Sequence, residues 1–316
     1  MKKSNIILFG AGYWGSKHLR VLSNLNNVQD IYVYDPSPEV CSELKSTYPK
    51  AIFIDDYDFI IKSKKINGAI IATPPPTHYD IALKCLSNNI HVLVEKPIVQ
   101  NISELERLNE IAVSKKLVLM SGHTFIFNNG IIKIKEIIDS GELGDIAYLI
   151  SDRLNFGIVR EDVSLEDNLA PHDLSIVQYL FDNQKIEKIE KNGISFLSEN
   201  SYDYQTIKID YSNNVKCFIN LSWYFPEKVR KIYVIGSKKM LVFDDSLQKK
   251  IKVYSNTINS MDLSNIIEKG YYEPEISMEE PLLNEQKHFI NCFENPDKCK
   301  TGYNHNYNII KVLEHK

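Results

Sequence analysis

The sequence lacks three features that would point to a special class of protein: long apolar runs, blocks of positive charge and regularly spaced cysteines. No run approaches the roughly 18 apolar residues that a membrane-spanning helix needs. Only four apolar residues directly precede Gly10, too few for the apolar core of a secretory signal peptide. Lys and Arg total 37 against 41 Asp and Glu, whereas duplex-binding proteins show a basic domain or stripe. We therefore expect neither a membrane nor a nucleic acid as a partner.

The five cysteines are odd in number and scattered along the chain. Only Cys292 and Cys299 lie close together, and their spacing matches neither a zinc motif nor a redox motif. The expectation is a cytoplasmic protein with reduced thiols and no metal site. Its 316 residues, 43% of them hydrophobic, predict two globular domains at roughly 150 residues each.

The first 122 residues alternate between short apolar runs and longer amphipathic stretches. Runs that are apolar on both faces and separated by helical patterns are typical of a parallel sheet built from βαβ units. The pattern predicts an α/β fold in which residues 1–122 form a doubly wound, dinucleotide-binding Rossmann domain. The expected strands are Asn5–Phe9, Gln29–Tyr34, Ala51–Ile54, Gly68–Ala72, His91–Val94 and Leu117–Ser121.

The pattern changes in residues 123–316, which we expect to form the second domain. Residues 130–140 have the periodicity of a helix, and Gly141 is placed to end it in a left-handed conformation. Apolar stretches joined by turns then predict an antiparallel meander with one buried face, interrupted by a helix at His172–Phe181. The expected strands and final helices are Ala147–Leu154, Thr206–Tyr211, Val215–Trp223, Lys231–Ile235, Met240–Phe243, Ile251–Tyr254, Pro281–Phe293 and Asn304–Glu314.

A glycine-rich turn joins the first expected strand to the first helix. In this context the first glycine permits the tight turn, the second admits a pyrophosphate, and the third lets the helix pack against the strand. The helix N-terminus adds unpaired N–H groups that attract anions. The alternative is a purely structural turn. The cofactor-binding residues predicted here are Gly10, Gly12, Tyr13, Trp14 and Gly15.

Asp35 follows the second expected strand, 20 residues after Gly15. An acidic residue at this distance accepts hydrogen bonds from the ribose hydroxyls of NAD. Because the same carboxylate repels a 2′-phosphate, we expect NAD rather than NADP as the cofactor. The alternative is a turn-forming Asp before Pro36.

The fourth expected strand leads into a stiff, proline-rich loop. Thr73 and Pro74 begin this loop at the carboxyl end of the sheet, where such folds bind their ligands. His78 follows at the start of the next helix and is predicted to help bind the cofactor, with capping or packing as its alternative role.

The fifth and sixth expected strands also end in polar residues. Glu95 and Lys96 follow the fifth strand, where a nicotinamide ring would lie, and His123 follows the sixth. The carboxyl ends of parallel strands meet at one edge of a sheet, so we expect these side chains and the glycine turn to line one crevice. For Lys96 the alternative is an ordinary solvated lysine.

In the second half of the chain, His172 lies at the start of an expected helix that Asn168 precedes by one turn. Taken alone, His172 fits a core or capping role as well as a catalytic one. Arg153, Asn155 and Arg160 lie between the first strand of this half and that helix, which makes them candidate substrate contacts. Lys228 and Arg230 are further cationic candidates for binding a diphosphate, with a solvated strand face as the alternative.

The chain resembles the Gfo/Idh/MocA family of oxidoreductases in the order and spacing of four motifs: Gly10–Gly15, Glu95-Lys96-Pro97, Gly122-His123 and Asn168–Asp173. The resemblance covers essentially the whole chain. It implies a Rossmann domain followed by an α/β domain with a large, open antiparallel sheet. It also implies that Lys96 contacts both the nicotinamide and the substrate oxygen and that His172 acts as general acid and base. The family's usual motif has an aspartate where this chain has Asn168.

Members of this family typically oxidise or reduce sugars, cyclitols or nucleotide-linked sugars with NAD or NADP, and often form homodimers or homotetramers. The resemblance therefore implies a small-molecule sugar or nucleotide-sugar substrate, and three stretches favour the nucleotide-linked class. The alternatives are a free-sugar or inositol dehydrogenase and a non-catalytic dinucleotide-binding sensor. The stretches are Leu169–Ser175, Trp223–Arg230 and Val234–Asp245.

Overall fold

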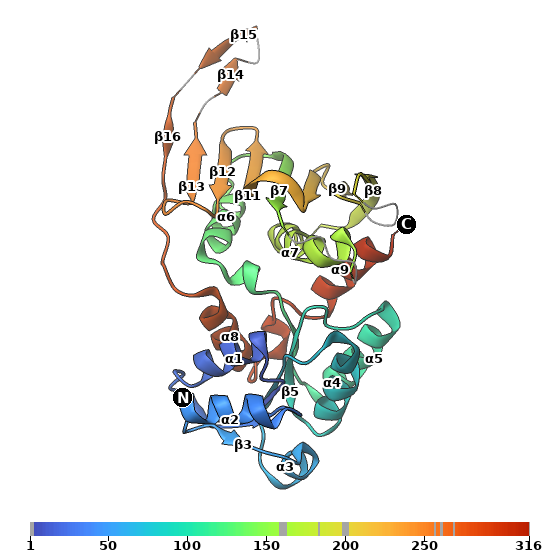
Figure 1. The fold of residues 1–316 in the computed structure, drawn as a ribbon. Helices are drawn as coiled ribbons and strands as arrows, with labels where there is room; N and C mark the ends of the chain where they lie inside the picture. Colours follow the sequence, from blue (N-terminus) through green and yellow to red (C-terminus); the bar gives the residue numbers. More distant parts are fainter. Residues whose placement is uncertain are drawn as a thin grey trace. The chain divides into compact units, whose positions relative to one another are not determined.

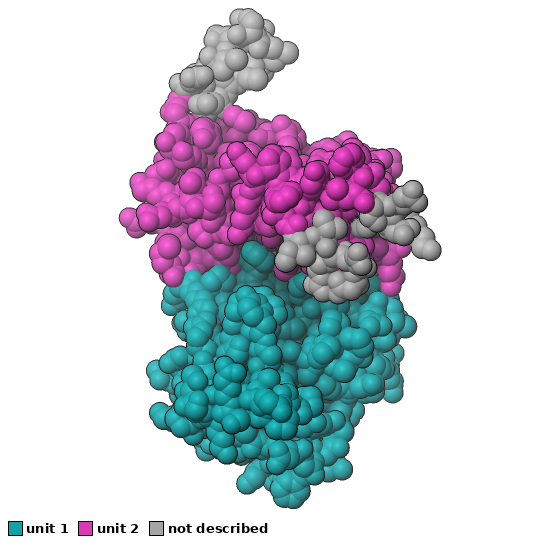
Figure 2. Space-filling view, in the orientation of Figure 1, with its two compact units in different colours: residues 1–127, 279–310 teal, residues 128–278, 311–316 magenta. Residues whose placement is uncertain are grey.

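The structure is a computed structural model that describes most of the chain. It covers residues 3–157, 163–182, 184–197, 202–255 and 269–315, and the backbone of residues 257–259 and 262–267. The chain forms two compact units (Figure 2). Unit 1 comprises residues 1–127 and 279–310, and unit 2 comprises residues 128–278 and 311–316.

Unit 1 is built on a six-stranded sheet (Figure 1). All its strand pairs are parallel, in the order β3-β2-β1-β4-β5-β6. This order defines the doubly wound Rossmann fold and confirms the predicted fold of this part of the chain. The strands are β1 Ser4–Phe9, β2 Val28–Tyr34, β3 Ile52–Phe53, β4 Gly68–Ile71, β5 His91–Glu95 and β6 Leu119–Gly122.

Three helices of unit 1 begin where short polar side chains cap them. Ser37, Asp56 and Asn101 each accept a backbone N–H from the first turn of the helix that follows, which satisfies a donor that the helix itself leaves unpaired. The helices are α1 Tyr13–Leu22, α2 Pro38–Thr47, α3 Tyr57–Ser63, α4 His78–Ser87, α5 Ile102–Lys115, α8 Pro281–Asn291 and α9 Tyr303–Glu314, with short 3₁₀ turns at Pro75–Thr77, Thr124–Phe127 and Pro296–Lys298.

Unit 1 also includes residues 279–310, which the sequence analysis placed in the second domain. Phe289 and Phe293 pack against Gly68, where a Cβ would lie 2.6 Å from the Phe293 ring. Thr301 extends the hydrogen bonding of the sheet edge: its carbonyl accepts the Ser121 N–H at 3.1 Å, and its hydroxyl donates to the Ser121 carbonyl at 2.8 Å. The end of the chain therefore completes the core of the first unit.

Unit 2 contains an eight-stranded sheet in the order β16-β13-β12-β11-β7-β10-β9-β8, and a separate two-stranded hairpin, β14–β15. Neighbouring strands are antiparallel except β7 and β10, which are parallel. The strands are β7 Ile146–Phe156, β8 Ile186–Ile194, β9 Tyr204–Tyr211, β10 Lys216–Ser222, β11 Tyr224–Gly236, β12 Met240–Asp244, β13 Ile251–Tyr254, β14 Thr257–Asn259, β15 Asp262–Ile267 and β16 Tyr271–Tyr272.

This sheet differs from the expected simple meander in two ways. A helix and two strands lie between β7 and β10 in the chain, so the chain returns to β7 in the same direction and a parallel pair results. Strand β8 was not predicted, because it lies at the sheet edge and its charged residues hide any alternation of buried and exposed positions. The short strands β14, β15 and β16 were missed as well.

Two helices accompany this sheet, α6 Asn129–Asp139 and α7 Leu165–Leu180. Gly141 has a φ of +71° after α6, which confirms the predicted left-handed end. Helix α7 begins seven residues before the expected start at His172, because Ser164 caps it by accepting the Asp167 N–H at 3.0 Å. Within the described ranges, no helix combines the length and apolar character needed to cross a membrane.

Candidate functional site

The glycine turn between β1 and α1 is shaped by close backbone approaches. Gly10 has a φ of +80°, and a Cβ there would lie 2.7 Å from the Ala72 carbonyl oxygen. A Cβ at Gly15 would lie 1.9 Å from the Gly10 carbonyl oxygen. At Gly12, by contrast, a Cβ would meet no described atom within 4 Å. Two glycines therefore serve backbone packing, whereas the third leaves open space.

The open space at Gly12 lies at the N-terminus of α1. Gly12 is the N-cap residue, and no side chain accepts a hydrogen bond there. Backbone N–H groups at such a helix end, together with the helix dipole, attract phosphate. Tyr13 and Trp14 follow, both solvent-exposed, with the Lys17 ammonium 4.0 Å and 4.7 Å from their ring centroids. These residues fit the pyrophosphate of a dinucleotide cofactor.

Asp35 ties the end of β2 to the glycine turn. Its Oδ2 accepts the Ala11 N–H at 2.7 Å, and its Oδ1 accepts the Ser37 N–H at 2.9 Å. The carboxylate therefore forms the local turn that the sequence analysis gave as the alternative, and it also orients the loop. A carboxylate has about four acceptor positions, so capacity for the ribose hydroxyls is left.

The loop after β4 is held by hydrogen bonds within it. The Thr77 hydroxyl donates to the Thr73 Oγ1 at 2.7 Å and lies 2.8 Å from the Pro74 carbonyl oxygen. His78 is buried, with Nε2 2.7 Å from the Thr73 carbonyl oxygen and Nδ1 2.8 Å from the Pro97 carbonyl oxygen. A neutral imidazole donates to one carbonyl at a time, and the protonated ring donates to both. His78 therefore joins the loops that follow β4 and β5.

Lys96 follows β5, and its backbone is fixed by the residue before it. Glu95 is buried, and its Oε2 accepts the Lys96 N–H at 3.2 Å. The Oε1 of Glu95 lies 2.9 Å from His18 Nε2 on α1. The Lys96–Pro97 peptide bond is cis.

His123 follows β6 and is buried against a second histidine. Its ring centroid lies 5.3 Å from that of His305. Burial lowers the pKa of His123 to about 4, although a hydrogen bond with Asn306 opposes the shift. Burial, followed by the nearby His123, lowers the pKa of His305 well below its ordinary value. Both imidazoles are therefore neutral at physiological pH.

The predicted residues of unit 1 thus lie at the carboxyl edge of one sheet. They follow β1, β2, β4, β5 and β6, as the strand pattern predicted. Their individual roles toward a cofactor stay predictions. The residues are Gly10, Gly12, Tyr13, Trp14, Gly15, Asp35, Thr73, Pro74, His78, Glu95, Lys96 and His123.

In unit 2, Arg153 is paired with an acidic residue that follows His172 directly. The Arg153 guanidinium forms an ion pair with Asp173 on α7, and both side chains are buried. The Ser151 hydroxyl also donates to Asp173, at 2.8 Å. The sequence analysis did not anticipate this pairing, which balances the charge of Arg153 inside the unit.

Asn155 is bound by Arg230, one of the two further cation candidates. Arg230 donates to the Asn155 Oδ1 at 2.6 Å and to the Leu154 carbonyl at 2.8 Å. Burial, with the nearby charge of Arg153, lowers the pKa of Arg230 to about 10. Lys228 is exposed, and Arg160 lies outside the described residues.

Asn168 and His172 lie one turn apart on α7, which puts them on the same face of the helix. Both are half-buried, whereas the neighbouring Asp173 is buried. The predicted residues of unit 2 therefore fall into two sets, the α7 pair and the Arg153–Asn155 pair on β7. The buried carboxylate of Asp173 joins α7 to Arg153.

Among the buried polar residues of unit 1 that sequence reasoning missed are His18, Glu285 and Gln286. His18 lies three residues after Gly15 on the buried face of α1, and this position was the only signal for it. Glu285 and Gln286 come from α8, which was assigned to the other domain. Burial, and then the charge of Glu95, raises the pKa of Glu285 well above its ordinary value.

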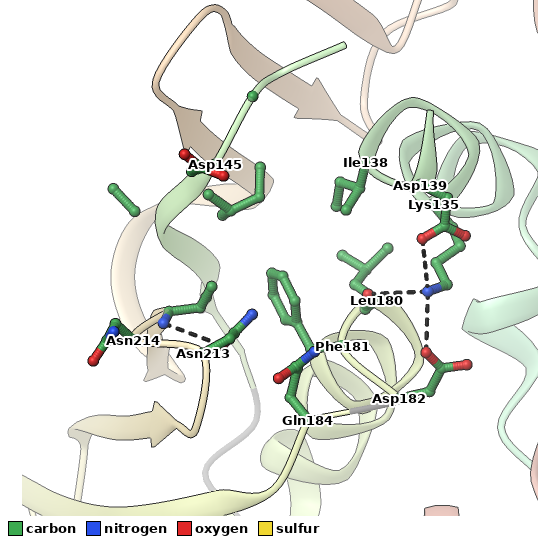
Figure 3. A pocket seen from close by; sticks show the side chains of 14 residues that line it. Lys135, Ile138, Asp139, Asp145, Leu180, Phe181, Asp182, Gln184, Asn213 and Asn214 are labelled. Atoms are coloured by element: carbon green, nitrogen blue, oxygen red, sulfur yellow. Dashed lines mark hydrogen bonds and ion pairs between the residues drawn. The ribbon is translucent and has the colours of Figure 1, made fainter. Parts of the chain in front are cut away.

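Unit 2 also has a pocket of about 600 Å³ beside α6 and the end of α7 (Figure 3). Lys135 projects into this region and forms 3.0 Å ion pairs with Asp139 and Asp182. Burial lowers the pKa of Lys135, but these two partners outweigh it and raise the pKa overall. None of the predicted site residues is among the described residues that line this pocket. Its described lining residues include one lysine and three aspartates, Asp139, Asp145 and Asp182.

A Rossmann unit with open space at the N-terminus of its first helix, followed by a unit with a large, mostly antiparallel sheet, is the architecture of a two-domain, dinucleotide-binding protein. Residues 4–123 match the family model described as "Oxidoreductase family, NAD-binding Rossmann fold", and residues 131–242 match the GFO/IDH/MocA C-terminal domain. The chain belongs to the Gfo/Idh/MocA family, and its cofactor is NAD.

Curated relatives are distant. Inositol 2-dehydrogenase 1 of Mycolicibacterium vanbaalenii is 26% identical over 212 residues, which are 65% of this chain and 62% of that protein. The chain spans between 61% and 67% of the length of the first curated relatives that it matches.

Solved structures establish the fold over nearly the whole chain. UDP-N-acetylglucosamine 3-dehydrogenase GnnA from Acidithiobacillus ferrooxidans has a TM-score of 0.82 at 17% identity, over 99% of this chain and 97% of that chain. GenD2 from gentamicin A biosynthesis, solved in complex with NAD, has a TM-score of 0.80 at 18% identity, over 99% and 93% of the two chains.

Proposed function

We propose that this oxidoreductase transfers a hydride between NAD and a hydroxyl-bearing carbon of a nucleotide-linked sugar. The observation that carries the proposal is Lys96, which lies at the carboxyl edge of the same Rossmann sheet as the open space at Gly12. The family's NAD-binding model over residues 4–123 supports the same reading.

NAD, when bound, supplies the hydride acceptor or, as NADH, the donor. In oxidation, His172 accepts the proton of the sugar hydroxyl, and the Lys96 ammonium stabilises the negative charge that develops on the oxygen. In reduction, His172 returns the proton. A positioned acid or base contributes about 10²–10⁴-fold to the rate, and an ordinary histidine pKa near 6.5 suits either direction. Asn168, one turn before His172, orients a substrate hydroxyl by hydrogen bonding.

The preference for NAD over NADP rests on Asp35. Its carboxylate is fixed by two backbone N–H groups, so it cannot turn away from a 2′-phosphate without losing both hydrogen bonds. We expect NADH to bind more tightly than NADPH in a fluorescence titration. Tighter NADPH binding would contradict the role given to Asp35.

The substrate class is tested with a panel of nucleotide sugars, free sugars and inositols in the presence of NAD. Turnover of a nucleotide sugar supports the proposal, whereas turnover confined to inositol favours the alternative that the inositol 2-dehydrogenase relative suggests. Lys96→Met should lose most of the turnover and still bind NADH. Near-normal rates in that variant would overturn the assignment of Lys96. NADH binding without turnover on any substrate would favour a non-catalytic sensor.

The proposed partner, besides the sugar, is a second copy of the chain. Phe218, Ile150, Tyr233 and Val242 lie side by side on four adjacent strands, all on the sheet face opposite the buried positions. All four are partly exposed, and an apolar row of this kind is typical of an interface. We expect a homodimer or homotetramer by light scattering, and Tyr233→Glu should shift it toward the monomer. An unshifted mass would exclude this face.

The proposed location is the cytoplasm. All five cysteines are free thiols, which a reducing compartment maintains. Burial raises the pKa of Cys85 and of Cys299 to about 12, so these two are poor nucleophiles.

A further inference from the structure

A chain of hydrogen bonds runs from α8 through α1 to the backbone of Lys96. Gln286 Nε2 lies 3.1 Å from the His18 carbonyl oxygen, to which it can only donate. The same nitrogen lies 2.9 Å from His18 Nδ1, which must therefore accept. His18 then carries its hydrogen on Nε2 and donates it to Glu95 Oε1 at 2.9 Å. The second oxygen of Glu95 accepts the Lys96 N–H at 3.2 Å.

Burial restricts the movement of the side chains that form this series of hydrogen bonds. His18 and Gln286 have no exposed surface, and Glu95 is 7% exposed. A buried polar group that loses its partner bears the full cost of its desolvation. Gly122 closes the remaining side, because a Cβ there would lie 3.2 Å from Glu95 Oε2. The carboxylate of Glu95 therefore has little freedom to move.

A second histidine holds the residue on the other side of Lys96. His78 Nδ1 lies 2.8 Å from the Pro97 carbonyl oxygen, and its Nε2 lies 2.7 Å from the Thr73 carbonyl oxygen. The two neighbours of Lys96 in the chain are thus fixed by two buried imidazoles. His18 comes from the helix that begins in the glycine turn, and His78 begins the helix after the proline-rich loop.

We propose that His18 and His78 are positioning residues that act through Glu95 and Pro97 to fix the backbone of Lys96 relative to the glycine turn. This inference rests on the proposed function, in which Lys96 contacts the reacting oxygen. As a consequence, helix α1 carries the phosphate site at its N-terminus and also holds the backbone of Lys96, through His18 and Glu95. A misplacement of about 1 Å can cost on the order of 100-fold in rate without a comparable loss in binding.

Variants that keep the volume and remove the hydrogen bonds test this proposal. His18→Phe and His78→Phe remove the imidazole nitrogens, and Glu95→Gln turns an acceptor near the Lys96 N–H into a donor. His18→Gln retains one donor and one acceptor and should recover part of the loss. The matched control is His288→Phe, in the same unit, where the imidazole accepts the Lys300 N–H at 3.1 Å, outside this chain of hydrogen bonds.

The first readout needs no substrate. Lysine amines are dimethylated with ¹³C-formaldehyde, and the Lys96 methyl signal is assigned by its absence in Lys96→Arg. We expect this signal to shift and narrow in His18→Phe, His78→Phe and Glu95→Gln, and to stay in place in His288→Phe. NADH affinity, measured by fluorescence, should change by no more than about 3-fold in His18→Phe, since His18 is the one residue of the three that is not a predicted cofactor contact.

The second readout is turnover of the sugar that the panel identifies. We expect kcat to fall roughly 10- to 100-fold in the three variants, with KM nearly unchanged, and to recover partly in His18→Gln. An unmoved Lys96 signal with full kcat in all three would overturn the positioning role, and so would equal losses in His288→Phe. Full activity in Lys96→Met would overturn the proposed function instead, and the NMR result would still decide the positioning of Lys96.

Discussion

The two units hold their candidate site residues by different kinds of contact. In unit 1, Asp35 binds two backbone N–H groups, His78 contacts two backbone carbonyls, and Glu95 binds the Lys96 N–H. In unit 2, Arg153 pairs with the Asp173 side chain. The candidate site residues of unit 1 are therefore held by contacts with backbone groups, whereas Arg153 in unit 2 is held by another side chain.

This difference predicts how each unit responds to substitution. A site fixed by backbone approaches is sensitive to any added Cβ where two segments come close, and insensitive where space is open. A site fixed by a buried ion pair is sensitive to the loss of either charge, because the other charge is left unpaired.

The largest effect is expected at Gly15. Gly15→Ala places a methyl group 1.9 Å from the Gly10 carbonyl oxygen, so the backbone of the turn must move. We expect a loss of more than about 4 kcal/mol in the free energy of unfolding, measured by denaturant titration, and with it the loss of NADH binding.

Gly12→Ala is the matched control for this prediction. Its Cβ meets no described atom within 4 Å, so the free energy of unfolding should change by no more than about 1 kcal/mol. The methyl group does fill the space assigned to the pyrophosphate, and NADH should bind at least about 10-fold more weakly. Unchanged NADH affinity in Gly12→Ala would mean that the cofactor phosphates lie elsewhere.

In unit 2 the corresponding test is Asp173→Asn. It leaves the buried guanidinium of Arg153 without its counter-charge, which costs about 3–5 kcal/mol. The control is Arg107→Met, which breaks the ion pair between Arg107 and Glu110. The side chains of this pair are 60% and 66% exposed, so its loss should cost less than about 1 kcal/mol. Chemical unfolding measures both.

A further variant, Arg153→Ala, decides the role of Arg153. If Arg153 binds the substrate, as its position in the sequence predicts, Arg153→Ala raises KM for charged nucleotide sugars more than for free sugars. If Arg153 serves only the ion pair with Asp173, the variant loses stability with KM unchanged.

The fold of unit 1 and the position of its site were predictable from sequence because both depend on local patterns. Six apolar runs separated by helices specify a parallel sheet, and polar residues that follow such strands meet at one edge. Gly10, Asp35 and Lys96 could therefore be placed together before the structure was known.

The remaining features depend on contacts between distant segments, which no local pattern records. The chain of hydrogen bonds that holds Lys96 joins residues 18, 95 and 286, and α8 could not be assigned to unit 1 without its packing against Gly68. Similarly, β7 and β10 form a parallel pair only because a helix and two strands, α7, β8 and β9, lie between them in the chain. The early start of α7 was hidden by Pro171, which is unfavourable inside a helix and yet lies within this one.

The most gradual effect we predict concerns Glu285, the second buried carboxyl of unit 1, whose Oε2 accepts a hydrogen bond from Thr124 at 3.1 Å. Burial, followed by the charge of Glu95, raises the pKa of Glu285 well above its ordinary value. Between the ordinary pKa and the raised one, the folded state keeps a proton that the unfolded state has released. The free energy of unfolding therefore falls as the pH rises, at a limit of about 1.4 kcal/mol per pH unit.

Glu285→Gln replaces the carboxyl group, which gains and loses a proton, with an amide of nearly the same shape that does not. The free energy of unfolding of the variant, relative to the unmodified protein, should therefore rise steadily from pH 5 to pH 7.5 in parallel urea titrations. His123 and His305, whose lowered pKa values destabilise the folded state as the pH falls, are common to both proteins and cancel in the difference. Glu110→Gln, at an exposed carboxylate on α5, should give a flat difference. A difference that does not change with pH for Glu285→Gln as well would show that Glu285 is ionised in the folded protein. Unit 1 would then tolerate the charges of two buried carboxylates, Glu285 and Glu95.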